Sequence, residues 1–98
     1  MYNYNEQYKI SGHSYLELYH HCLRYHDEFK NKIPKECELI EQTAFETDKT
    51  LYKPLLNNIT SGVSYDQMKA CGIEILCGKN QFYEKRQKFF WLLEKKKI

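Results

Sequence analysis

The chain has 98 residues, of which 42% are hydrophobic and 29% are charged. This length predicts a single small domain, and this composition excludes a disordered or low-complexity chain. The longest apolar run, residues 89–93, is far shorter than the roughly 20 residues that span a bilayer. The chain does not open on an apolar or arginine-rich segment. We therefore expect a cytoplasmic protein that does not enter the membrane.

Charge is distributed unevenly along the chain, although the net charge is only +2. Residues 13–48 hold four basic and eight acidic residues, a net charge of −4. Residues 79–98 hold seven basic and two acidic residues, a net charge of +5. A basic end of this kind suits a polyanionic partner such as nucleic acid, and the acidic segment offers a surface of the opposite sign.

The sequence predicts an N-terminal arm over residues 1–12, followed by a single helical domain over residues 13–98. Ser14 and Glu17 have the spacing of a capping box, which predicts that a helix starts there. Pro34 either closes this helix or opens the next one. The apolar face of the helix has residues three and four apart: Tyr15, Leu18, Tyr19, Cys22, His26, Phe29 and Ile33.

A second amphipathic helix is expected over residues 35–47. Its apolar positions recur at helical spacing, and acidic residues occupy many of the others. The apolar positions are Cys37, Ile40 and Ala44, with Leu39 and Phe45 beside them. A further helix cap is expected around Thr47 and Asp48.

The third and fourth predicted helices are short and have clear ends. One covers residues 51–61 and ends at Gly62, which suits the left-handed conformation of a helix C-terminus. The other covers residues 64–70 and opens on a capping box formed by Ser64 and Gln67.

A long basic helix over residues 79–97 completes the domain, after Gly72 and a connector that ends at Gly78. Phe82, Phe89 and Leu93 share one face of this helix and predict its buried side. We therefore expect an all-α domain of four or five helices. The last part, residues 50–97, has the order of a helix-turn-helix with a long connector.

The second helix of such a pair enters the major groove of DNA with its early polar residues. Asn and Gln can bind adenine through two hydrogen bonds, and Lys can contact guanine or phosphate. The candidate DNA-contacting residues are Lys79, Asn80, Gln81, Lys85, Arg86 and Lys88. Arg86 could instead lie along the aromatic core, and the whole helix could be structural, with a solvated lysine-rich face.

The segments Thr60 to Tyr65 and Asn80 to Arg86, followed by the apolar run Phe89 to Leu93, resemble a known family. They are similar to the sigma-region-4-like helix-turn-helix of small phage and prophage regulators, the ArpU-like and RinA-like proteins. The resemblance covers about residues 50–97 and implies DNA contact by Asn80, Gln81, Lys85 and Arg86. The connector is longer, and arginines are fewer, than in that family.

Other chemistry is weakly supported by the sequence. Four cysteines and four histidines are present, but their spacing does not match a zinc site, so we expect no metal and no cofactor. No phosphate-binding loop, nucleophile motif or paired-carboxylate motif is present, and we expect a protein that is not an enzyme. The cysteines are expected as thiols, although Cys71 and Cys77 could lie close enough to oxidise.

The leading hypothesis is a small DNA-binding regulatory protein of a phage or integrated mobile element. Because one helix contacts few base pairs, double-stranded DNA would be bound by a homodimer or with a larger DNA-bound protein, such as a recombinase or RNA polymerase. The alternative is an accessory factor that acts on such a protein through its acidic helices: a recombination directionality factor, a polymerase-binding factor or a host-defence inhibitor. The candidate protein-interface residues are Tyr15, Tyr19, Glu38 and Glu41.

Overall fold

The computed structural model describes residues 8–26 and 34–97, and every regular element within them is a helix. The five helices are α1 (Gly12–Leu23), α3 (Pro34–Thr47), α4 (Tyr52–Ser61), α5 (Tyr65–Ala70) and α6 (Lys79–Lys97). The predicted all-α fold of four or five helices is confirmed. The expected order of a helix, a short helix, a connector and a long helix is also present in the last part of the chain.

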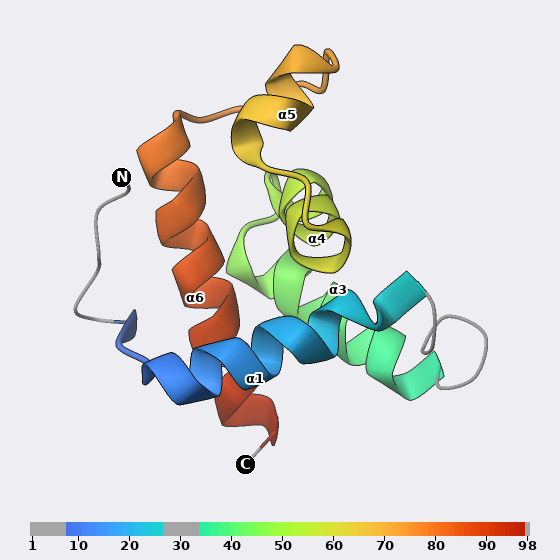
Figure 1. Ribbon diagram of the computed structural model, residues 1–98, viewed down its shortest axis with the longest axis vertical. Helices are drawn as coiled ribbons and strands as arrows, with labels where there is room; N and C mark the ends of the chain where they lie inside the picture. The colour runs from blue at the N-terminus through green and yellow to red at the C-terminus, as the bar shows by residue number, and fades with distance from the viewer. Residues whose placement is uncertain (1–7, 27–33, 98) are drawn as a thin grey trace.

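The long helix α6 is the central packing partner of the fold (Figure 1). It packs against α1, α3 and α4, and α1 crosses the half of α6 that lies nearer the C-terminus. The predicted apolar face of α6 is its buried side, because Phe82, Phe89 and Leu93 are fully buried. Each of the other helices adds buried apolar side chains to this core: Leu18, Cys22, Ile40, Ala44, Leu55, Ile59, Tyr65 and Met68.

The start of α1 differs from the predicted one. The helix begins at Gly12, and the hydroxyl of Ser11 caps it by accepting a hydrogen bond from the Ser14 N–H over 3.1 Å. The predicted capping box of Ser14 and Glu17 is therefore wrong, because the carboxylate of Glu17 pairs instead with the His13 Nε2 at 2.9 Å. Two serines stand near the helix start, and the earlier one is the cap.

The end of α1 also differs from the predicted one. The helix ends at Leu23, where the Arg24 N–H donates to the His21 carbonyl three residues back. The apolar face was expected to continue to Phe29 and Ile33, which lie outside the described residues. Pro34 opens α3, one of its two predicted roles.

The remaining caps include two that the sequence predicts, whereas the N-cap of α4 is Leu51, which makes no side-chain cap hydrogen bond. Ser64 and Gln67 form the expected capping box of α5. Gly62 ends α4 with a φ of 72°, in the left-handed region. The expected cap near Asp48 holds the turn before α4, where its Oδ1 accepts hydrogen bonds from the N–H groups of Thr50 and Leu51 over 2.9 and 3.2 Å.

Replacing Gly62 by alanine tests the left-handed cap. A Cβ there would lie 3.7 Å from the Tyr19 hydroxyl, an ordinary contact, so the cost comes from the backbone conformation. We expect Gly62→Ala to lower the free energy of unfolding by about 1 kcal/mol. Urea unfolding of the wild type and the variant measures this loss. The matched control is Gly12→Ala, where the backbone is helical and nothing lies within 4 Å of the new Cβ, so an equal loss there would contradict the explanation.

Candidate nucleic-acid interface

The first turn of α6 presents three consecutive polar side chains to solvent. Lys79, Asn80 and Gln81 are exposed, whereas Phe82, the next residue, is fully buried. The Phe82 ring packs against Tyr65 of α5, with the ring centroids 5.5 Å apart. This buried ring fixes the rotation of α6 about its own axis, and the three polar residues face outward as a consequence.

The short helix α5 holds the first turn of α6 in place. The Tyr65 N–H donates to the Tyr83 hydroxyl over 3.3 Å, and the Tyr65 hydroxyl donates to the Cys77 carbonyl over 2.8 Å. At the same junction, the Lys79 Nζ lies 2.6 Å from the Asp66 Oδ2. The hydrogen bond to Asp66 and the charge of that carboxylate raise the pKa of Lys79. Three contacts therefore join α5 to the start of α6 when the Phe82 ring is included, and the bond to Cys77 joins α5 to the connector.

Lys85 and Lys88 lie on the following turns, and both make contacts within the protein. The Lys85 Nζ is 3.4 Å from the Asp48 Oδ2, and the Lys88 Nζ is 5.8 Å from the centroid of the Tyr8 ring. Partial burial acts to raise the pKa of Asp48, but hydrogen bonds from Thr50 and the charge of Lys85 outweigh it and lower the pKa. Partly exposed ion pairs and cation–ring contacts contribute little free energy, so both ammonium groups can move to a phosphate at small cost.

Arg86 points into the protein, unlike the other candidate residues on α6. Its Nε donates to the Asn58 Oδ1 over 2.8 Å, and its Nη1 donates to the Tyr15 hydroxyl. The guanidinium carbon lies 4.9 to 5.3 Å from the centroids of three rings: Tyr15, Tyr19 and Phe90. Of the two roles that the sequence allows for Arg86, these contacts favour packing along the aromatic core.

The acidic and basic segments of the sequence pack against each other in the structure. On the last turn of α6, the Lys96 Nζ is 3.1 Å from the Glu46 Oε2, and the Lys97 Nζ is 3.3 Å from the Glu36 Oε2. Both acidic partners belong to α3, which lies beside α6. These two pairs offset part of the charge gradient along the sequence, so the outward basic charge of this turn is smaller than the sequence suggests.

Glu36 also joins α1 to these two helices. Its Oε2 lies 2.9 Å from the His21 Nε2 and 3.3 Å from the Lys97 Nζ, so the three residues form a cluster between α1, α3 and α6. Partial burial acts to raise the pKa of Glu36, but the hydrogen bonds from His21 and Lys97, together with their charges, outweigh it and lower the pKa below its usual range. No pattern in the sequence indicated this cluster, because its members are far apart along the chain.

The four candidate protein-interface residues lie in two separate places. Tyr15 and Tyr19 are half-buried on the side of α1 that faces Arg86, and both rings contact Phe90. Glu38 and Glu41 are exposed on α3, where they line a shallow hollow with Gln42, Phe45 and Tyr52. The Glu41 carboxylate also accepts a hydrogen bond from the Tyr25 hydroxyl. Only the α3 pair therefore lies on an open surface.

The cysteines divide between the core and the connector. Cys22 and Cys37 are buried on apolar helix faces, as predicted, and burial raises the pKa of Cys22 to about 12. Cys71 is exposed and Cys77 is half-buried, both as thiols, and burial raises the pKa of Cys77. Across residues 8–26 and 34–97, no group of three or more potential ligand side chains is placed to hold a metal ion.

No protein-family model matches the chain, and no curated protein or solved structure is detectably similar to it. Within the described part of the chain, no helix has both the length and the apolar character needed to cross a bilayer.

The Glu36 cluster predicts a pH dependence of stability. The pKa of Glu36 is lower in the folded state than in the unfolded state. The stability that Glu36 contributes is therefore fully present at a pH above its unfolded-state pKa, and it is lost as the pH falls through its folded-state pKa. We expect Glu36→Gln to lower the free energy of unfolding by about 1 kcal/mol near neutral pH, and by progressively less in acid. Urea unfolding across this pH range measures it. Glu74→Gln, at an exposed position in the connector, is the control. If Glu36→Gln lost the same stability at every pH, the ionised Glu36 carboxylate would not be the source of the effect.

Proposed function

We propose that the protein is a small DNA-binding regulator of a phage or integrated element, and that it binds double-stranded DNA through the first turn of α6. The observation that carries this proposal is the outward position of Lys79, Asn80 and Gln81, on a turn that α5 holds in place. An amide side chain at the start of a helix can bind the edge of adenine in the major groove.

The arrangement of the helices leaves this turn accessible. It lies beside α5, at the opposite end of α6 from the crossing with α1 (Figure 1). A duplex that met the first turn would therefore approach an end of the molecule made by α5, the connector and α6. Lys69 of α5 is exposed on the same short helix and adds a positive charge there.

Phosphate contacts would come from the lysines of the first three turns of α6. Lys79, Lys85 and Lys88 each make a contact within the free protein, with Asp66, Asp48 and the ring of Tyr8. Such contacts position a protein on DNA without specifying sequence, and they make affinity depend strongly on salt. Arg86 has no part in the proposed interface, because its guanidinium points into the protein, where its Nε and Nη1 donate to Asn58 and Tyr15.

A salt titration of binding to a short random-sequence duplex tests the proposal. We expect affinity to fall as salt rises, and the logarithmic slope to decrease by about 1 for each contacting lysine replaced. The variant to compare carries Lys79→Gln, Lys85→Gln and Lys88→Gln. Fluorescence anisotropy at several salt concentrations measures both proteins.

The control removes the same charge from the other end of the same helix, with Lys95→Gln, Lys96→Gln and Lys97→Gln. This variant should keep the wild-type slope more closely than the first. Absence of wild-type binding at low salt, or equal losses in the two variants, would contradict binding through the first turn of α6.

A second candidate function is supported by the exposed face of α3. Glu38 and Glu41 stand beside Phe45, whose ring is 44% exposed and packs edge-on against Tyr52. Carboxylates beside an aromatic ring suit lysine and arginine side chains of a protein partner. This accessory-factor function predicts no binding in the DNA titration, so the same experiment separates the two candidates.

A further inference from the structure

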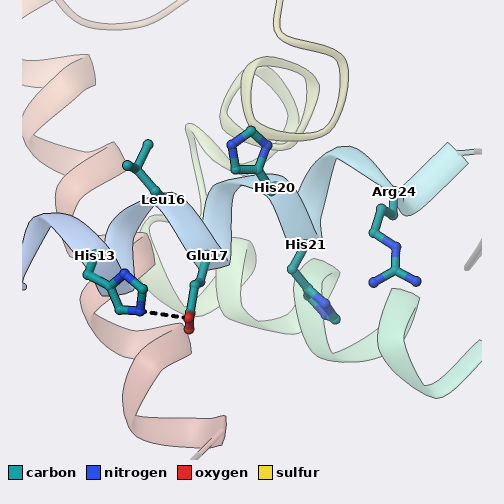
Figure 2. A pocket seen from close by; sticks show the side chains of 6 residues that line it. All are labelled: His13, Leu16, Glu17, His20, His21 and Arg24. Carbon is teal, nitrogen blue, oxygen red and sulfur yellow. Dashed lines mark ion pairs between the residues drawn. The ribbon is translucent and has the colours of Figure 1, made fainter.

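The outer face of α1 is a row of exposed side chains with helical spacing. Figure 2 shows this face, which we define by five residues: His13, Leu16, Glu17, His20 and Arg24. Leu16 is 53% exposed, more than an apolar side chain in a packed helix face would be. The opposite side of α1 is anchored in the core by Leu18 and Cys22, so the helix presents this row from a fixed position.

The charges on this face are arranged so that the face complements itself. Glu17 and Arg24 are seven residues apart, close to two helical turns, and therefore point to the same side of α1. When two copies of the helix lie antiparallel about a two-fold axis midway between these residues, each Glu17 meets Arg24 of the second copy. The two-fold axis therefore produces two identical Glu17–Arg24 pairs, as in every two-fold symmetric interface.

We propose that a second copy of this chain binds here, with the two α1 helices packed antiparallel through their outer faces. Leu16 supplies apolar area beside each of the two Glu17–Arg24 pairs, and His20 lies near the two-fold axis. The charge order along the face favours a second copy over a uniformly basic or acidic partner, because each of those would meet one residue of like charge.

The contacts of this face within the chain are compatible with the pairing, including the one that Arg24 makes, since a guanidinium has five N–H donors. The His13 Nε2 lies 2.9 Å from the Glu17 Oε1, but the Glu17 side chain is still 68% exposed and has a second oxygen for a partner. The first turn of α6 lies at the far end of that helix from α1 (Figure 1). Pairing through α1 therefore does not depend on the proposed DNA binding, and each can fail without the other.

Charge reversal tests the pairing, with sedimentation equilibrium of the full chain as the measurement. We expect the wild type to form a dimer as concentration rises. Glu17→Arg and Arg24→Glu should each weaken the dimer by roughly 10- to 30-fold, since each change places like charges together at two points. An equimolar mixture of the two variants should restore association, because every facing pair is then of opposite charge.

Leu16→Glu and Leu76→Glu provide a matched pair of controls, since both leucines are exposed, at 53% and 66%. Circular dichroism checks that each variant keeps its helices. The proposal requires that Leu16→Glu prevents association and that Leu76→Glu, in the connector, does not. A wild type that stays monomeric at all concentrations, equal effects of the two leucine variants, or a mixture that fails to associate would overturn it.

Discussion

The guanidinium of Arg86 lies where α1, α4 and α6 meet, and its contacts constrain all three helices. It donates to Asn58 of α4 and Tyr15 of α1, and rings from α1 and α6 surround it. A partly buried cation is stable only when its donors are satisfied, and the planar guanidinium satisfies two acceptors in different directions at once. The position of Arg86 thus helps to fix the side of α6 that faces α1, and with it the side that remains for a ligand.

The packing of the acidic helix α3 against the basic helix α6 affects the charge that the surface presents. α3 supplies Glu36 and Glu46 to the lysines at the end of α6, so the most basic stretch of the sequence is engaged within the protein. Individual exposed pairs of this kind contribute little to stability. Their effect on function is larger, because they engage Lys96 and Lys97 at the end of α6, whereas Asn80 and Gln81 stay exposed in its first turn.

Local signals in the sequence predicted much of this fold, and long-range contacts account for what they missed. The capping box of α5 and the left-handed Gly62 depend on neighbouring residues, so their patterns were sufficient. The choice between Ser11 and Ser14 as cap was missed because both have the required chemistry. Arg86 bonds to a tyrosine 71 residues away, and its role could be decided only when the helices were placed. The exposed outer face of α1 was missed for the same reason, because burial of its other side is a property of the folded chain.

A double-mutant cycle on Arg86 and Tyr15 tests most directly whether this junction holds the helices together. Tyr15→Phe removes only the hydroxyl that accepts from Arg86, and Arg86→Met removes the guanidinium while keeping an unbranched apolar stem. We predict that the two losses in the free energy of unfolding are coupled by about 1 kcal/mol, the order expected for a hydrogen bond to a charged group that is partly exposed. Losses that add to within about 0.3 kcal/mol would show that the contact contributes nothing to the fold and would contradict this account.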